Sequence, residues 1–308
     1  MMRKPRALAT GDRIAIIAPA SSAATEEILA GVAELRALGF EPQYEPSLFE
    51  RRRYTAGSPA TRAEALKRAW HDPDIKAIIA ARGGYGSVQL LPLLDPADFA
   101  RSPKPFIGYS DNTSLLAWLT LRAGLVTFHG PMIEGRFARG ATAYDPGTFE
   151  RCLMHHEPIG EITHEQLEVV CNGEASGMLL GGTMTQLAGS LGTPYAFDPP
   201  DGCILFFDEV GERPYRVDRL FTQLAQAGII ARASALVFGE MPRCDEPAGP
   251  PSIRDVVADL THDFRGPVLF GLPSGHTSGA TLTLPFGVRA RVVANGAPTL
   301  VIEEPAVE

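Results

Sequence analysis

The chain has 308 residues, of which 45% are hydrophobic and 21% charged, as in a folded globular protein rather than a disordered or membrane one. Its length favours two medium-sized domains. The formal net charge is −8 and the only compact basic run is the three arginines at 51–53, which argues against a nucleic-acid partner. The apolar stretch 14–20 is too short for a signal sequence or a membrane span, so we expect a cytoplasmic protein with no membrane partner.

The cysteines and histidines form no recognisable disulfide or metal-binding pattern. The four cysteines are widely spaced, without a CxxC pair, and a chain of this size does not depend on disulfides. The adjacent His155 and His156 would point apart on a helix or a strand. We expect buried free thiols and no metal site.

The first 130 residues or so alternate between apolar runs and helical patterns, which predicts a parallel sheet wrapped by helices. Residues 13–19 resemble a buried strand, and residues 25–38 resemble a helix that stops at Gly39. The same pattern continues with a helix at 61–70, strands at 75–81 and 105–109, and a helix at 115–123. Doubly wound sheets place their sites at the carboxyl ends of such strands.

The sequence becomes polar and irregular from about residue 135 to about residue 175, which indicates a boundary. We expect an N-terminal domain over residues 1–140, a linker over 141–172 and a C-terminal domain over 173–308. The last of these is predicted to be a mixed α/β or barrel-like domain. Its expected elements are strands at 203–207, 235–238, 280–284 and 290–293 and a helix at 217–227.

Ser110 lies between the apolar run that ends at Tyr109 and a helix that begins near Asn112. A hydroxyl at such a turn lies near backbone N–H donors and the positive end of the helix, which suits a nucleophile that forms an oxyanion. The local sequence GYSDN differs from the G-x-S-x-G of α/β-hydrolases. On local sequence alone, a helix cap formed by Ser110 or Asp111 is the more common explanation.

Other polar residues also follow predicted strands. The run 82–86, RGGYG, offers backbone N–H groups to an oxyanion or carboxylate, although a tight turn explains it equally well. The apolar run 203–207 ends in Asp208 and Glu209, and His276 lies in a loop after another apolar run. Each acid alone is more commonly a helix cap or surface ion pair, and a lone loop histidine is usually solvated.

Taken together, these residues supply the parts of a catalytic triad. A serine nucleophile needs a base to accept its proton and a carboxylate to orient that base. Ser110, His276 and one of Asp208 or Glu209 provide all three groups.

Eight segments stand in order along the chain: GDRIAIIAPASS, ARGGYGS, FIGYSDNTSL, TFHGPM, GGTMTQLAGSLGTPY, ILFFDEVGERPYRVDRLFTQLAQAG and GLPSGHT with TLPFGVRA. Through these segments, from about residue 11 to about residue 290, the chain resembles the serine LD-carboxypeptidases, also called muramoyltetrapeptide carboxypeptidases. It implies a flavodoxin-like N-terminal half with a parallel sheet, and a mixed α/β C-terminal half with a small barrel. It also implies a Ser-His-Glu triad, with its serine at Ser110 and its histidine at His276.

The acid of this triad departs from the family pattern. The family usually has Glu-Asp at the end of the strand, whereas this chain has Asp208 followed by Glu209. Alignment by position puts the acid at Asp208, one methylene shorter. Since neighbours in a strand point to opposite faces, Asp208 and Glu209 cannot both face His276 without a local distortion. Asp208 is the expected partner because aspartate orients the histidine in many triads, and Glu209 would need a register shift or a bulge.

The resemblance further implies release of the terminal D-alanine from cytoplasmic murein tetrapeptide during peptidoglycan recycling, by a homodimer without a cofactor. We expect the oxyanion donors to be the N–H groups of Gly84 and Asp111. The candidates for substrate binding are Arg82, Gly83, Arg213 and Arg216. A guanidinium suits a carboxylate, although each arginine could instead form an ordinary ion pair.

Two other functions remain open. Some members of the family resemble the microcin C immunity peptidases, although the short segment after Gly239, without an aromatic-rich insertion, argues mildly against that role. Alternatively, the chain could be a catalytically silent protein that binds murein peptides.

Overall fold

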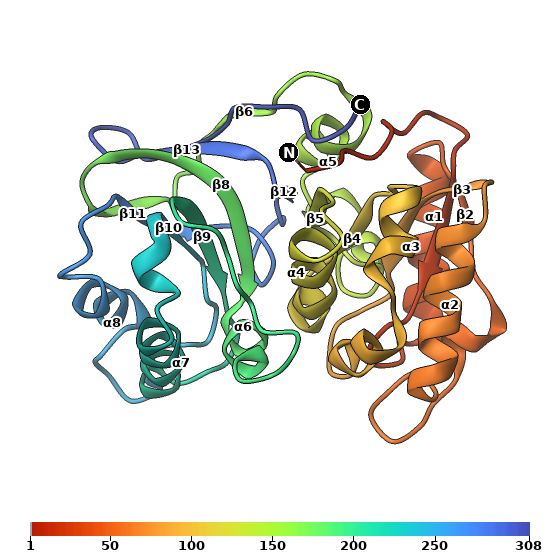
Figure 1. Cartoon of the computed structure of the whole chain (residues 1–308), viewed down its shortest axis with the longest axis horizontal. Coiled ribbons are helices and arrows are strands. Elements are labelled where there is room, and N and C mark those ends of the chain that lie inside the picture. Colours follow the sequence, from red (N-terminus) through yellow and green to blue (C-terminus); the bar gives the residue numbers. More distant parts are fainter. Residues whose placement is uncertain (1) are drawn as a thin grey trace.

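The computed structural model describes residues 2–308, which form two sheets with surrounding helices (Figure 1). The first sheet has the strand order β12-β5-β4-β3-β1-β2. Its strands are β1 (Arg13–Ile17), β2 (Glu41–Gln43), β3 (Ile75–Ala80), β4 (Phe106–Gly108), β5 (Thr127–His129) and β12 (Leu284–Phe286). The first five pair in parallel in the order 2-1-3-4-5, which is that of flavodoxin.

Helices connect the parallel strands of this sheet and cover it (Figure 1). The connecting helices are α1 (Thr25–Ala37), α2 (Pro59–His71), α3 (Pro96–Arg101) and α4 (Thr113–Leu121), and α5 (Pro146–Met154) follows the last parallel strand, β5. In α1, Ile28, Val32 and Leu35 are buried, as their helical spacing predicts. The side chain of Ser58 caps α2 by accepting the N–H of Thr61.

The second sheet has the order β6-β14-β13-β8-β9-β10-β11-β7. Its strands are β6 (Gly160–Ile162), β7 (Glu168–Cys171), β8 (Glu174–Thr183), β9 (Cys203–Asp208), β10 (Ala233–Gly239), β11 (Val268–Leu272), β13 (Arg289–Val293) and β14 (Thr299–Ile302). The central strands β8 to β11 are parallel, the outer pairs are antiparallel, and β8 arches across the sheet (Figure 1). Helices α6 (Met184–Ser190), α7 (Pro214–Gln226) and α8 (Ile253–Leu260) complete this half. The α/β fold with a flavodoxin-like first sheet is thus confirmed.

The path of the chain differs from the expectation in two places. The run 280–284, expected as a strand, makes isolated bridges at Thr281 and Leu282, and the strand β12 begins only at Leu284. It crosses to the first sheet because Leu284–Phe286 pairs antiparallel with Thr127–His129. The segment 141–172, expected as a linker, contains α5, β6 and β7. The domain boundaries themselves stay a prediction.

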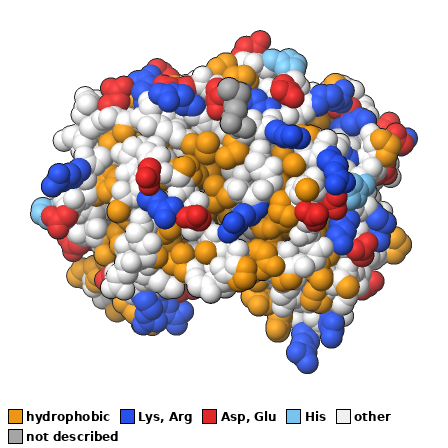
Figure 2. All heavy atoms as spheres, in the orientation of Figure 1, with side chains coloured by type: hydrophobic (Ala, Val, Ile, Leu, Met, Phe, Trp, Pro, Cys, Tyr) orange, Lys and Arg blue, Asp and Glu red, His pale blue; other side chains and the backbone are white. Residues whose placement is uncertain are grey.

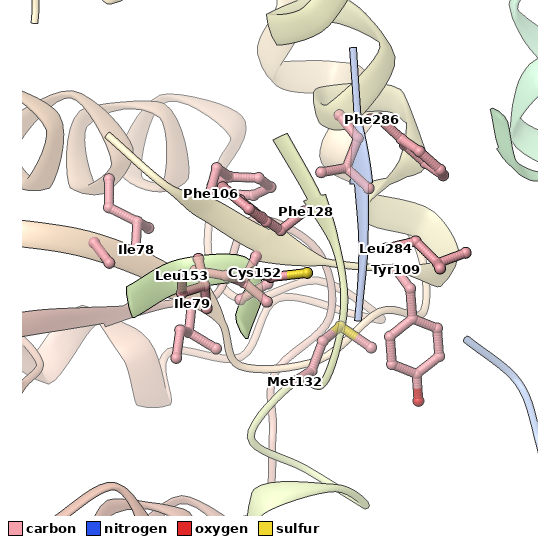
Figure 3. Packing of buried hydrophobic residues seen from close by; sticks show 14 of the residues in the cluster. Ile78, Ile79, Phe106, Tyr109, Phe128, Met132, Cys152, Leu153, Leu284 and Phe286 are labelled. Carbon is pink, nitrogen blue, oxygen red and sulfur yellow. The ribbon is translucent and has the colours of Figure 1, made fainter. Parts of the chain in front are cut away.

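A large cluster of buried side chains fills the first half and extends beneath the second sheet. Figure 3 shows part of it, where Phe106 and Phe128 lie side by side, Phe286 lies apart from them on β12, and Tyr109 lies at the edge with its hydroxyl pointing away. A second cluster lies between β9, β10 and helices α6 to α8. Acidic and basic side chains are interspersed over the face shown in Figure 2. Among residues 2–308, no helix combines the length and apolar character needed to cross a membrane.

Candidate active site

Ser110 is separated from the end of β4 only by Tyr109 and has a left-handed backbone, with φ of 62°. This conformation costs a non-glycine residue roughly 1–3 kcal/mol and tends to persist where function requires it. The short turn at Ser110–Asn112 leads into α4, and both begin without a side-chain cap. Instead, the carboxylate of Asp111 accepts the N–H of Ser87 at 2.8 Å and the amide of Gln186 at 3.2 Å. A helix cap therefore does not explain these two residues.

The glycine loop after β3 packs against Ser110. A Cβ atom on Gly83 would lie 2.7 Å from both Cβ and Oγ of Ser110, so only glycine allows this approach. Gly84 has φ of 100°, and a Cβ atom there would collide with Ser21. The loop thus places its backbone beside the serine hydroxyl. That this backbone binds an oxyanion stays a prediction.

A buried arginine beneath this loop ties two strand ends together. The guanidinium of Arg62 donates hydrogen bonds to the carbonyls of Pro19 and Gly86, the latter at 2.7 Å. Burial lowers the pKa of Arg62, while the carboxylate of Asp111 acts in the opposite direction. Arg62 therefore joins the segments that follow β1 and β3, and the second of these bonds to Asp111 through the N–H of Ser87.

Asp208, the last residue of β9, binds His276 through both carboxylate oxygens. Oδ2 lies 2.7 Å from Nδ1 of His276, and Oδ1 accepts the backbone N–H of His276 at 3.2 Å. The side chain of Asp208 is fully buried and that of His276 is 16% exposed. A Cβ atom on Gly275 would lie 2.6 Å from Asp208 Oδ2, so a glycine is required beside the pair.

Glu209 points elsewhere, as strand alternation requires. Its Oε1 accepts hydrogen bonds from the N–H and the hydroxyl of Thr185, each at 2.6 Å. Burial raises the pKa of Glu209, and its bonds with Thr185 oppose that rise. Glu209 thus binds the first turn of α6, while Asp208 contacts the histidine.

The environment of His276 favours its protonated form. Burial alone would lower its pKa, but the charge of Asp208 and the hydrogen bond to Asp208 outweigh burial, so the pKa lies above its ordinary value. With Nδ1 bonded to the carboxylate, Nε2 is the nitrogen left for proton transfer. This is the arrangement in which a carboxylate orients a general base.

Arg136, which the sequence did not single out, links the two halves of the site. Its Nε donates to the hydroxyl of Tyr109 at 3.2 Å, and Nη1 and Nη2 each donate two hydrogen bonds to backbone carbonyls. The four carbonyl acceptors are those of Ala143, Gly275, Thr277 and Gly279. The ring of Tyr109 meets that of His276 edge-on at a centroid distance of 5.1 Å. One buried guanidinium thus contacts the residue before Ser110 and the loop that carries His276.

Two further residues near His276 also escaped the sequence reasoning. His129 is fully buried, with Nδ1 3.0 Å from the hydroxyl of Ser274, and burial lowers its pKa to about 4, so it is neutral at neutral pH. Glu240, just after β10, accepts hydrogen bonds from the hydroxyl of Thr277 and the N–H of Ser278. Only their positions, His129 at the end of β5 and Glu240 just after β10, could have drawn attention to them.

The three arginines proposed to bind substrate lie in different surroundings. Arg82, next to Gly83, pairs with Glu134 at 2.7 Å. Arg213 and Arg216 lie at the start of α7 with half-exposed side chains. They pair with Glu246 at 3.7 Å and Glu212 at 3.2 Å. Only Arg82 is thus placed beside the loop that packs on Ser110.

Comparison with known proteins identifies the family. Residues 14–130 match the LD-carboxypeptidase N-terminal domain, and residues 176–292 match the C-terminal domain. The chain belongs to the LD-carboxypeptidase family. It is 38% identical to a Streptomyces coelicolor protein provisionally named a carboxypeptidase, over 98% of this chain and 97% of that protein. It is 32% identical to the murein tetrapeptide carboxypeptidase of Pseudomonas aeruginosa, over 86% and 88% of the two chains.

Among solved structures, the LD-carboxypeptidase fold of this chain matches the microcin C7 self-immunity protein MccF. The TM-score is 0.91 at 25% identity, over 99% of this chain and 100% of the matched chain. The resemblance seen in the sequence is therefore confirmed at the level of the family. Ser110 lies within the matched N-terminal segment, and Asp208 and His276 lie within the matched C-terminal one.

Proposed function

We propose that this chain is a serine-type LD-carboxypeptidase that releases the terminal D-alanine from a murein tetrapeptide. The observation that supports it is the bond between Asp208 and Nδ1 of His276 at 2.7 Å, in the loop that Arg136 ties to the residue before Ser110. Family membership makes the chain a peptidase, and the name of the Pseudomonas aeruginosa relative supports the substrate. The recycling role, the cytoplasmic location and the homodimer belong to the same proposal and rest on the family resemblance.

In this proposal Ser110 Oγ attacks the carbonyl carbon of the amide while Nε2 of His276 takes the hydroxyl proton. The N–H groups of Gly84 and Asp111 bind the resulting oxyanion. His276 then gives its proton to the amine nitrogen of D-alanine as the C–N bond breaks, which leaves an acyl-enzyme. A water molecule, deprotonated by His276, hydrolyses the ester and regenerates Ser110. Asp208 holds the imidazole and stabilises its cationic form throughout.

The test is mass spectrometry of products after incubation with murein tripeptide, tetrapeptide and pentapeptide. We expect loss of one alanine residue from the tetrapeptide alone. An unchanged tetrapeptide at high enzyme concentration would contradict the proposal.

The structural match to MccF favours a second candidate, a microcin-immunity type of peptidase. One solved MccF structure holds aspartyl sulfamoyl adenosine, so this compound serves as a competing substrate. Cleavage of it without cleavage of the tetrapeptide would favour this candidate. Binding of the tetrapeptide without any product would identify a silent binding protein.

A further inference from the structure

A cavity of about 300 Å³ is lined by residues that adjoin Ser110 and His276 in the chain. Its walls include Tyr109, the residue before Ser110, and Thr277, the residue after His276. The other lining residues are Gly135, Arg136, Arg139, Thr142, Ala143, Ser278 and Gly279. Its volume is at the lower end for ligand pockets, which suits a single small residue rather than a long peptide.

The two arginines of this cavity differ in what their charges do. Arg136 is buried, and its five hydrogen bonds to Tyr109 and the surrounding carbonyls use all five of its N–H donors. Arg139 is exposed, and its guanidinium forms no ion pair with any residue in the range 2–308. Arg136 therefore holds the wall of the cavity in place, whereas the N–H donors of the Arg139 guanidinium are available to a ligand.

The charge of Arg139 acts on Tyr109, which lines the same cavity. Burial raises the pKa of Tyr109, and the positive charges of Arg136 and Arg139 both oppose that rise. The guanidinium of Arg139 therefore lies close enough to the phenol to affect it.

A second cavity of about 400 Å³ adjoins the first, since Gly135 and Arg139 line both. It also contains Arg51, Arg82 and Glu134. Arg82 is paired with Glu134 at 2.7 Å, and Arg51 lines the second cavity but not the first, so among residues 2–308 Arg139 is the arginine without an ion pair that lines both cavities. A third cavity of about 530 Å³, near β2 and α2, contains none of the proposed catalytic residues.

We propose that the cavity beside Tyr109 and Thr277 receives the C-terminal residue of the peptide, and that Arg139 binds its α-carboxylate. This inference rests on the proposed function, because it assigns the group that leaves in that reaction. A guanidinium binds a carboxylate with two parallel hydrogen bonds, which orients the terminal residue as well as attracting it. The assignment replaces Arg213 and Arg216, which are paired with acids at the start of α7.

The test compares a tetrapeptide with a free C-terminal carboxylate and the same peptide with a C-terminal amide. In the wild type, kcat/KM for the acid should exceed that for the amide by roughly 10- to 100-fold, the range for a charge-assisted pair. Arg139→Gln should remove this preference by lowering kcat/KM for the acid alone. Arg139→Lys should retain part of it. Arg265→Gln, at another exposed arginine, should behave as the wild type.

A binding measurement separates this inference from the proposed function. Isothermal titration of both peptides onto the Ser110→Ala variant, with and without Arg139→Gln, reports carboxylate recognition without turnover. If the acid binds more tightly and Arg139→Gln abolishes the difference, the inference stands even if no variant cleaves the peptide. It is overturned if Arg139→Gln keeps the acid preference, if the wild type shows none, or if Arg213→Gln or Arg216→Gln removes it instead. Thermal melting checks that each variant is folded.

Discussion

The two sheets contribute different kinds of structure to the site. The first sheet supplies backbone geometry: Ser110 has a left-handed conformation, and Gly83 permits a contact that any side chain would prevent. The second sheet supplies buried charge, in the bond between Asp208 and His276. Substitutions in the two halves should therefore affect catalysis in different ways. A change in the first should misplace the nucleophile without moving the pH dependence, whereas a change in the second should alter the pKa of the base.

The largest effect is expected from Ser110→Ala in the first half. The methyl group cannot attack the amide, so kcat should fall by on the order of 10⁶. The pH at which the variant unfolds should not change, because no titrating group is lost. Single-turnover assays with tetrapeptide measure the effect, and activity within tenfold of the wild type would exclude Ser110 as the nucleophile.

The second largest effect is expected from Asp208→Asn. The loss in kcat should approach ~10⁴, because the amide favours the wrong imidazole tautomer. Asp208 raises the pKa of His276, so its removal lowers that pKa. Since the base acts in its neutral form, the acid limb of the kcat/KM profile should move to lower pH. An acid limb that stays in place would show that Asp208 does not control the base.

Glu209→Gln is the matched control for the neighbouring carboxylate. Its bonds with Thr185 at the start of α6 predict a loss of thermal stability with kcat nearly unchanged. If Glu209→Gln instead abolished activity and Asp208→Asn did not, the assignment of the acid would be reversed.

The sequence predicts those features that depend on contacts between residues close together in the chain, and it misses those that depend on residues far apart. The βα units of the first sheet are local, so periodicity predicted β1, α1 and β3 within a few residues. Strand alternation alone predicted that Asp208 and Glu209 would diverge. Arg136, in contrast, bonds to carbonyls some 140 residues later, and β12 returns to the first sheet beside β5. No local sequence pattern predicts such long-range contacts, because they form only when the whole chain has folded.

Gly83→Ala would test the backbone contribution of the first half alone. The new Cβ atom would lie 2.7 Å from Ser110 Oγ, so the hydroxyl must shift. Misplacement of about 1 Å can cost on the order of 10²-fold in rate, and the acid limb should stay where it is. Gly189→Ala, which meets nothing within 4 Å in α6, is the control and should retain full activity. Equal rates for the two variants would mean that the glycine loop does not position the serine.

A smaller loss than that of Gly83→Ala, about tenfold in kcat, is expected from Arg136→Lys, because Arg136 contacts both halves of the site. An ammonium group has three donors without the planar fork, so it cannot hold Tyr109 and the loop of His276 together as Arg136 does. The melting temperature should fall too, because buried carbonyls lose partners. The positive charge remains, however, so the acid limb of kcat/KM should not move.

Arg136→Gln completes this test, because it removes the charge as well. Arg136 lowers the pKa of His276, so the neutral variant should raise that pKa and move the acid limb to higher pH, opposite to Asp208→Asn. A purely structural role predicts equal loss of activity in both variants and no shift in either. A shift in the glutamine variant alone would show that the guanidinium joins the two halves by geometry and also tunes the base by its charge.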